Sequence, residues 1–586
     1  MKIRRCAALL TAICLMGGLL TACNGKGDVR DPASSETRPT PVNRLDAIDP
    51  TSDKAGRPFY DVSELETVGS DAADAKEFDY FAFTTEHNLA LPFNLACYIG
   101  DGELTAVLPA GVDRSALVAD FSLSGARAVY NGADMVSGET KLDLNEPVTL
   151  SLEARDGSKQ DVTLKVEALA TGIPSVALTT IDYYAIDSRY SYRDCTVYVG
   201  GGDSRYCDYA AETPLLMTAT AKGRGNSSWE QPKKGYTVKL AEKAKLLGMS
   251  NSKDWALVAN YEDKSLIRNN VAMYLSETIG TSYVMQMRPV DFWYNGVYWG
   301  TYNLCEKVEI EGDRVNITKY DEATYTTPDS IGYLMEFDGH VAEVPHQQSD
   351  QWSTTGSYFY YDPFTEETFM PLGIGGKWLT LKKPSVTELK DEMADYVGEY
   401  ISNISIALQT NDYAEIEKQL DVTSFARWYI VEELMNNTDS SMHSSVFMTL
   451  DAGGKLKLGP PWDFDRSSGN CDYWNTKDEI DSLYTSTAGW FYLLFQNPEA
   501  RTILKQEWAT FYQNISDLES VIRGYANTLA ASQEYNFRRW NILNSKVGAN
   551  PNAVVYANSY DKQVDLLVNY LTARVEKMNK FINGLH

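Results

Sequence analysis

Hydrophobic and polar residues alternate along the second hundred residues of the chain, as they do in half-buried β-strands. In the segment PVTLSLEARDGSKQDVTLKVEAL, residues 147–169, the alternation continues on both sides of Asp156-Gly157, and Asn131-Gly132 marks a second tight turn. Such pairs are typical of short turns between antiparallel strands. The pattern predicts a small all-β, immunoglobulin-like sandwich over residues 76–170, which would act as a spacer or bind a glycan or a protein ligand.

From residue 173 to residue 586 the pattern changes from strands to helices. Two hairpins are predicted, at residues 215–240 and 288–309, with a helix at 263–279 between them. An irregular, aromatic insert is expected at about 321–383. Helical periodicity follows at residues 386–409, 422–436, 489–513 and 564–582. The sequence therefore predicts an α+β domain with a strand-rich front and a helical back.

The first 22 residues have the composition of an export signal, with a basic start and an apolar run too short for a comfortable membrane helix. Their end, followed by Cys23, resembles the bacterial lipobox, in which the cysteine is lipidated and becomes the new N-terminus. The resemblance implies a lipoprotein signal peptide at residues 1–22 and a membrane anchor at Cys23, with acyl chains such as palmitate. A polar, flexible tether would then extend over residues 23–75. The alternative is a plain secretory signal that is cut elsewhere.

We therefore expect a lipid-anchored protein outside the cytoplasm, on the cell membrane or the outer surface. The formal net charge is −27, and removal of the three cations in residues 1–22 leaves −30. Such a charge repels nucleic acid backbones and argues against a DNA- or RNA-binding role.

Cysteine spacing gives little support for a zinc site, because no CxxC pair occurs. Beyond Cys23 the chain has five cysteines: Cys97, Cys195, Cys207, Cys305 and Cys471. Cys195 and Cys207 are close enough in sequence for a local disulfide, and isolated core thiols are the alternative.

Several common catalytic motifs are absent from the sequence. Residues 373–378, GIGGKW, lack the spacing of a Walker A loop, and neither GxSxG nor HExxH occurs. The chain has five histidines, which are scattered along the sequence, so the sequence gives little support for a histidine-based triad or metal site.

Two distant segments carry the candidate chemistry. Residues 222–240, KGRGNSSWEQPKKGYTVKL, combine small residues with cations, which suits a phosphate chain; a tight hairpin turn is the ordinary alternative. Residues 458–470, LGPPWDFDRSSGN, contain the neighbouring acids Asp463 and Asp465. If this stretch is extended, its two aromatic side chains point one way and both acids the other. Paired acids suit a hard divalent cation such as Mg²⁺.

Together these motifs resemble the spore-coat CotH kinase family. The residues that carry the resemblance are 224–229, 232–234, 236–240, Asp263, Arg268, 300–306 and 459–470. It implies an atypical protein-kinase-like fold and transfer of the γ-phosphoryl group of ATP, with Mg²⁺ or Mn²⁺, to Ser or Thr of an exported protein. The order of the motifs agrees with kinases, in which an early cation holds phosphates and a later acid holds metal.

The resemblance assigns roles at the phosphate and adenine end of the site. Lys239 would be the phosphate-binding lysine, with Glu277 as its helical partner. Arg224 and Asn226 would touch phosphates or brace their loop, and Glu306 would meet the adenine. The ordinary alternative for Lys239 is a solvated strand lysine.

At the opposite end the resemblance makes Asp439 the catalytic acid or base and Asp463 the metal ligand. Asp465 would be a second ligand or a supporting group. The ordinary alternatives are a helix cap for Asp439 and a salt bridge between Asp465 and Arg466. Five residues after Asp439, where ordinary kinases have a metal-binding asparagine, this chain has Ser444.

A function of another class competes with the kinase. Because ATP is scarce outside the cytoplasm, the chain could be a non-catalytic surface adhesion or scaffold protein that retains the kinase fold. The aromatic segment at residues 351–364 could then bind a glycan or a partner. A glycosidase is disfavoured, since carboxylates two residues apart on one strand cannot easily flank a sugar bond.

Overall fold

The computed structural model describes residues 72–585 except 101, 204–212, 339–352, 363–366, 373–376, 441, 473–479 and 488. All of these residues belong to one compact unit, Asn43–His586. The signal peptide, Cys23 and most of the expected tether lie outside the described residues.

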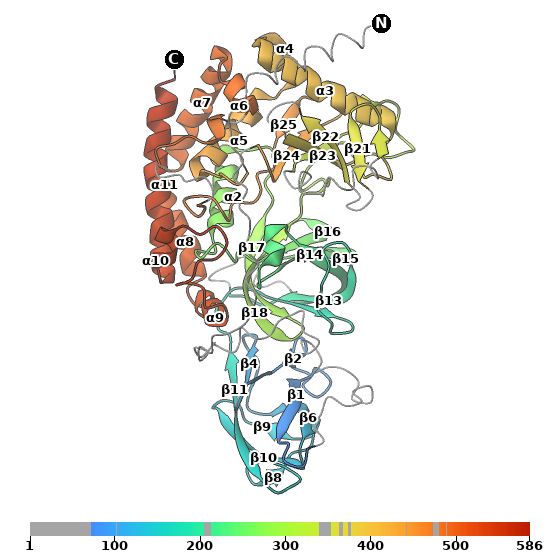
Figure 1. Cartoon of the computed structure of the whole chain (residues 1–586), viewed down its shortest axis with the longest axis vertical. Coiled ribbons are helices and arrows are strands. Elements are labelled where there is room, and N and C mark those ends of the chain that lie inside the picture. Colours follow the sequence, from blue (N-terminus) through green and yellow to red (C-terminus); the bar gives the residue numbers. More distant parts are fainter. Residues whose placement is uncertain are drawn as a thin grey trace, which may run out of the picture. The chain divides into compact units, whose positions relative to one another are not determined.

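Short strands make up the first region, drawn in blue and cyan in Figure 1. They form sheets with the orders β2-β1-β6, β3-β4-β11-β10-β7-β8 and β5-β9. The strands are β1 (Glu77–Phe83), β2 (Leu95–Ala96), β3 (Tyr98–Gly100), β4 (Glu103–Leu108), β5 (Leu117–Val118), β6 (Asp120–Ser124), β7 (Arg127–Tyr130), β8 (Ala133–Asp134), β9 (Lys141–Leu142), β10 (Val148–Glu153) and β11 (Lys159–Ala168).

Both turns expected in this region are present. Asn131 and Gly132, with φ of 50° and 79°, connect β7 to β8, and β10 pairs with β11 from Glu153↔Lys159 onward. The region is therefore all-β, and its description as an immunoglobulin-like sandwich stays a prediction.

The next seven strands form a closed barrel in the order β12-β13-β14-β15-β16-β18-β17. They are β12 (Ser175–Thr180), β13 (Arg193–Gly200), β14 (Leu215–Arg224), β15 (Gly235–Lys245), β16 (Asn251–Val258), β17 (Met287–Tyr294) and β18 (Val297–Glu306). The predicted hairpins are β14–β15 and β17–β18, the second turning at Asn295-Gly296. The parallel pairing of β12 with β17 closes the barrel around aromatic side chains such as Tyr236, Phe292 and Tyr302.

The helix after β16 begins five residues later than its periodicity predicts. α2 spans Arg268–Ile279 and ends at Gly280, whose φ is +73°. The buried carboxylate of Asp263 accepts hydrogen bonds from the backbone N–H groups of Ser265 and Arg268 and pairs with the Arg268 guanidinium at 2.5 Å. These bonds hold residues 263–267 as a capping loop rather than a helical turn.

Strands also occupy the segment that was expected to be an irregular insert, so that prediction is wrong. A second seven-stranded sheet has the order β20-β21-β22-β23-β19-β24-β25. Its strands are β19 (Tyr333–Phe337), β20 (Ser353–Thr355), β21 (Phe359–Asp362), β22 (Glu367–Leu372), β23 (Lys377–Lys383), β24 (Val446–Leu450) and β25 (Leu456–Leu458). β19 pairs with β24, whose residues lie over a hundred positions later (Met335↔Met448), and such distant pairing leaves no local signal.

The remaining α-helices of the described chain follow β23. They are α3 (Asp391–Thr410), α4 (Tyr413–Gln419), α5 (Val422–Met435), α6 (Gly489–Leu494), α7 (Pro498–Asn514), α8 (Leu518–Thr528), α9 (Ser532–Arg539), α10 (Asn552–Tyr556) and α11 (Tyr560–Asn583). The buried helix α5 contacts α2, α7 and α11. α11 contacts α5, α7 and α8, and Figure 1 shows it in red beside α7 and α8.

One expected helix is divided in two, because Asn497 caps α7 and Pro498 occupies its first position. None of the described helices is both long enough and apolar enough to cross a bilayer.

The barrel contains a buried acid, Asp291 of β17. It accepts hydrogen bonds from Thr171 Oγ1 at 2.5 Å, Ser532 Oγ at 2.6 Å and Tyr298 OH at 3.1 Å. Burial raises the pKa of Asp291 to about 6, against the opposing effect of these donors. Because the folded-state pKa lies above the usual value, ionisation of Asp291 destabilises the fold. The unfolding free energy attributable to this group therefore falls as pH rises from about 4 to about 6.

The variant Asp291→Asn removes this ionisation. We expect the unfolding free energy of the native protein, relative to that of Asp291→Asn, to fall by on the order of 2 kcal/mol between pH 4 and pH 7. Denaturant melts of both proteins at several pH values measure the difference. Thr171→Val, which removes a donor, should move the transition to higher pH. A difference that does not change over this range would contradict the assignment.

Candidate active site

The acidic motif is a turn rather than the extended strand predicted from its alternation. Asp463 has a φ of +68°, outside the strand region. Two side chains hold it: Asn269 Oδ1 accepts from the Phe464 N–H at 2.8 Å, and Asn437 Nδ2 donates to the Asp463 carbonyl at 3.0 Å. The aromatic and acidic side chains still differ in exposure as expected, because Trp462 and Phe464 are buried while Asp463 is exposed.

Left-handed backbone is concentrated around this turn. Non-glycine residues with φ of 48° to 68° occur in the segment after α5 and in the acidic motif: Asn436, Met442, Ser445, Asp463 and Ser468. Each such conformation costs on the order of 1 kcal/mol, and such residues often gather where function fixes the backbone. The cluster therefore marks these two segments as a candidate site.

A buried ion pair connects the acidic motif to the barrel. The Arg466 guanidinium makes two bonds to the Glu262 carboxylate, from Nε at 2.9 Å and from Nη2 at 2.8 Å. Arg466 Nη2 also donates to Ser227 Oγ at 3.1 Å, and Nη1 lies 3.5 Å from Asp439 Oδ1. One side chain thus joins the glycine-rich loop between β14 and β15 (residues 225–234), the segment that follows β16, and the segment after α5.

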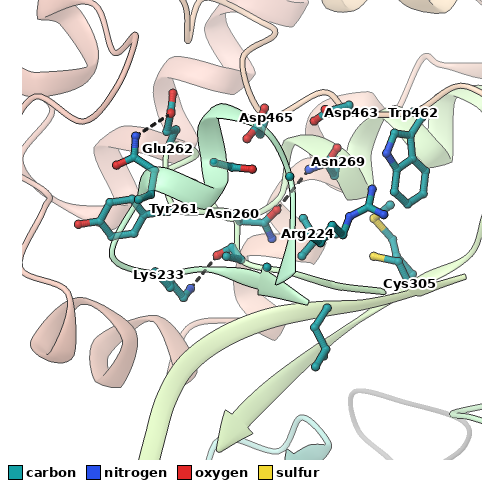
Figure 2. A pocket seen from close by; sticks show the side chains of 18 residues that line it. Arg224, Lys233, Asn260, Tyr261, Glu262, Asn269, Cys305, Trp462, Asp463 and Asp465 are labelled. Carbon is teal, nitrogen blue, oxygen red and sulfur yellow. Dashed lines mark hydrogen bonds between the residues drawn. The ribbon is translucent and has the colours of Figure 1, made fainter. Parts of the chain in front are cut away.

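Two adjoining cavities lie along this connection. The first has apolar walls from the barrel, formed by Leu257, Val258, Met287 and Cys305. The second, of about 240 Å³, is lined by acids and by the glycine-rich loop and contains Asp439. The two cavities share Arg224, Glu262, Trp462, Asp463 and Asp465. Figure 2 shows Asp465 and Asp463 next to each other, with Trp462 beside Asp463 and Arg224 below them.

The acids in the polar cavity repel one another. Burial, followed by the charges of Asp463 and Glu262, raises the pKa of Asp465 well above its usual range. Burial and the charge of Asp463 also raise the pKa of Asp439, while Arg466 opposes the shift. A positive charge placed here would relieve this repulsion.

These carboxylates fit a hard divalent cation that is completed by substrate phosphates. No three His, Cys, Asp or Glu side chains in the described ranges are arranged to hold a metal by themselves. Mg²⁺ typically needs only one or two carboxylates, because phosphates and water complete its coordination. Asp463 and Asp465 are the residues that would hold it.

Arg224 and Asn226 both reach the polar cavity. The Arg224 guanidinium lies over the Trp462 ring, 4.9 Å from its centroid, at the junction of the two cavities. Asn226 is exposed, and its Oδ1 accepts a hydrogen bond from Arg189 Nη1 at 2.6 Å. The stacked guanidinium is the group best placed to meet a phosphate chain.

Lys239 lies away from both cavities. It is exposed on β15, opposite Thr220 and Asp254, and it makes no ion pair with Glu277, which the structure also describes as exposed. Lys233 lines the first cavity instead. The geometry therefore gives no support to Lys239 as the phosphate-binding lysine.

The ammonium of Lys233 is already engaged. Its Nζ donates to the carbonyls of Ala259 and Thr301 and to Asn536 Oδ1, at 2.8, 2.5 and 2.9 Å. Burial lowers the pKa of Lys233. Because three acceptors use its three hydrogens, Lys233 braces the cavity wall rather than offering a free donor.

Glu306 faces away from the apolar cavity. Its carboxylate accepts from the backbone N–H groups of Ser250 at 2.8 Å and Gln286 at 3.0 Å, while the preceding residue, Cys305, lines the cavity. Alternation along β18 explains this difference. Glu306 fixes two loops, and the geometry gives no support to a contact with adenine.

The ordinary alternatives were a helix cap for Asp439 and a salt bridge to Arg466 for Asp465. α5 ends at Met435 with Asn436 as its C-cap residue, so Asp439 lies beyond the helix end. Arg466 pairs with Glu262 and Asp439. Both acids line the polar cavity, with 37% of the Asp439 side chain exposed.

Sequence reasoning missed Glu262 and Asn269. Both are buried polar residues, and each makes a contact that positions the acidic motif. The available signal was a charged residue directly after the apolar strand pattern DWALVANYED, residues 254–263. Because the partners are about 200 positions away, this signal did not identify what Glu262 contacts.

The disulfide between Cys195 and Cys207 stays a prediction, because only Cys195 lies among the described residues. Cys195 is a buried free thiol in the barrel, and burial raises its pKa to about 12. Cys207 lies outside the described residues.

Comparison with known proteins identifies the family of this chain. The family model described as CotH kinase protein matches residues 221–578, which is more than half of the chain. The chain therefore belongs to the CotH kinase family. No curated protein matches.

Two solved structures match parts of this chain with low sequence identity and low TM-scores. A protein from Bacteroides fragilis, described provisionally as secreted, is 21% identical over 17% of this chain and 98% of its own, with a TM-score of 0.13. A protein from Bacteroides thetaiotaomicron, described provisionally as a glycoside hydrolase, is 11% identical over 50% of this chain and 66% of its own, with a TM-score of 0.15.

Comparison of Arg224→Ala with Lys239→Ala tests which cation meets the nucleotide. We expect Arg224→Ala to weaken binding of ATP with Mg²⁺ at least tenfold, about 1.4 kcal/mol, because a charge-assisted bond to phosphate is lost. Lys239→Ala, on the exposed strand face, should change the affinity less than twofold, which is below about 0.5 kcal/mol. Calorimetric titration measures both values. The reverse order would favour the assignment implied by the family resemblance.

Proposed function

We propose that this protein transfers the γ-phosphoryl group of ATP, with Mg²⁺ or Mn²⁺, to a Ser or Thr hydroxyl of an exported protein. Family membership supports a CotH-type domain, and the nucleotide, metal and acceptor are our inference. The observation that carries the proposal is that Asp439, Asp463, Asp465 and Arg224 line one cavity, although Arg224 lies more than 200 positions before the acids.

The two cavities would bind different parts of the reactants. The apolar walls would hold the nucleoside, and Arg224 would meet the phosphates at the junction. The acceptor hydroxyl oxygen would form a bond to the γ-phosphorus while the bond to the ADP oxygen breaks. Asp439, partly exposed at the polar cavity, would orient the hydroxyl and accept its proton.

A divalent cation would neutralise charge on the phosphates. Asp463 and Asp465 would hold it. Asn269 and Asn437 position these acids through backbone bonds, so the proposed ligands are fixed before nucleotide binds.

Phosphoryl transfer can be measured with γ-labelled ATP and Mg²⁺ or Mn²⁺. We expect label in the native protein or in an added exported protein, and a loss of at least about 100-fold in Asp439→Asn, which lacks the basic carboxylate. Asp463→Asn should also lose transfer, together with metal-dependent nucleotide binding. Asp439→Asn should keep that binding, measured as the rise in Tm with nucleotide and metal.

These two readouts separate the proposal from its rival. Nucleotide binding without transfer in the native protein would favour an adhesion or scaffold protein that retains the fold. If nucleotide with either metal failed to raise Tm, both the activity and the nucleotide site would be excluded.

We further propose that Cys23 anchors the protein to a membrane outside the cytoplasm. The sequence around residues 20–23 supports this proposal. Cys23→Ser removes the thiol to which the lipid would be attached, so we expect the protein to move from the membrane fraction to the soluble exported fraction. Fractionation followed by immunoblotting measures the change. Unchanged membrane association of Cys23→Ser would contradict the lipid anchor.

A further inference from the structure

Several buried oxygen atoms at the end of α5 and in the segment after it have no hydrogen-bond partner among the described residues. Glu432, in the last turn of α5, is completely buried, and within the described part of the chain neither of its carboxylate oxygens has a partner. Asn437 Oδ1 and Ser440 Oγ are also buried and without partners in the part of the chain that the structure describes. The neighbouring acid Glu433 differs, because Arg574 and the backbone N–H groups of Tyr484 and Ser486 bind it.

The three side chains belong to one cluster. Asn437 and Ser440 lie close enough to Glu432 to act on its ionisation as hydrogen-bonding groups, although neither bond has normal geometry. Asp463 and Glu433 add negative potential. Burial raises the pKa of Glu432 well above its usual range. A buried carboxylate without donors is among the most costly arrangements in a protein interior.

The atoms without partners are oxygens of the kinds that bind hard cations. Two come from a carboxylate, one from an amide and one from a hydroxyl. One hydrogen of the Asn437 amide nitrogen is donated to the Asp463 carbonyl at 3.0 Å, so the amide keeps a single hydrogen that could act on Glu432.

We propose that Glu432, Asn437 and Ser440 form a buried binding site for a hard cation, separate from the open cavity that contains Asp463 and Asp465. A cation here would satisfy the carboxylate oxygens together with the amide and hydroxyl oxygens. The burial of all three residues favours a dehydrated ion, Ca²⁺ or an alkali ion, over Mg²⁺, which retains several of its waters.

The site is connected to the proposed active site through Asn437. A cation on Asn437 Oδ1 fixes the amide, whose nitrogen holds the carbonyl of Asp463 in its left-handed conformation. Binding would therefore order the acidic motif without contacting nucleotide. The inference does not depend on phosphoryl transfer, because cation binding can be measured on the protein alone.

The test uses the full exported chain after chelation and dialysis, without nucleotide. The variant Asp463→Asn/Asp465→Asn removes the two proposed metal ligands of the open cavity but leaves Asp439 and Glu262 in its lining. A rise in Tm is therefore assigned to the buried cluster only where Glu432→Gln abolishes it. We expect Ca²⁺, Na⁺ or K⁺ to raise the Tm of this double variant, and calorimetry to give one ion per chain. Mg²⁺ should give a smaller rise than Ca²⁺ at the same concentration.

Glu432→Gln, which is nearly isosteric, assigns the binding to this cluster. In the background of the double variant, Glu432→Gln should abolish the rise in Tm. Without cation it should be at least as stable as its parent, because it removes a buried carboxyl group that must either stay protonated or carry an unpaired charge. Ser440→Ala, which keeps the charge, should weaken cation binding on the order of tenfold and provides the test if Glu432→Gln fails to fold.

Two results would overturn the proposal. One is a double variant whose Tm responds to none of the four cations, which would leave Glu432 as a protonated or water-bound acid. The other is an equal response with and without Glu432→Gln or Ser440→Ala, which would place the cation at another site.

Discussion

The buried ion pair between Glu262 and Arg466 is the constraint on which the site depends. Removing two charges from water is costly, and the cost is recovered only when the bonding of both groups is nearly complete. Arg466 therefore binds both carboxylate oxygens of Glu262. These oxygens also accept from Gln231 Nε2 and from the Ala549 N–H, each at 3.3 Å. Because the pair joins residues 204 positions apart, the barrel and the acidic motif cannot shift independently without breaking it.

The same pair determines which charges remain for a ligand. Arg466 is engaged by Glu262 and lies near Asp439, so it offsets only part of the negative charge in the polar cavity. Burial, followed by the charges of Asp463 and Glu262, raises the pKa of Asp465, and Arg466 opposes this shift only in part. A bound cation would supply the missing positive charge, while Arg224, held against Trp462, offers its guanidinium to an anion.

Local signals predicted much of the fold. Asn295-Gly296 identified a hairpin of the barrel, and the periodicity of α5 gave its bounds to within one residue. Closure of the barrel and the pairing of β19 with β24 were not predicted, since each joins distant segments. β20 to β23 pair with their neighbours along the chain and were missed although that pairing is local. Similarly, motif order located Asp439, Asp463 and Asp465 in one cavity but could not say which side of β15 carries Lys239.

Glu306 shows why motif resemblance and strand geometry must be considered together. One position along β18 decides whether a side chain lines the apolar cavity, as Cys305 does, or caps loops on the other side, as Glu306 does. A sequence motif identifies the strand that borders the cavity, and the alternation of side chains along that strand determines which of its residues line it.

Charge also constrains how a nucleotide could enter such a site. The chain carries a net charge of −27, and the polar cavity is lined by several acids and two arginines, one of them already paired. A free polyphosphate would be repelled both by the overall field and by the cavity. A divalent cation bound to the polyphosphate lowers the net negative charge of the complex. The same cation would also offset the negative charge of Asp463 and Asp465. On the proposed function, metal and nucleotide would therefore enter as one complex, with Arg224 as the first cation to meet the phosphates.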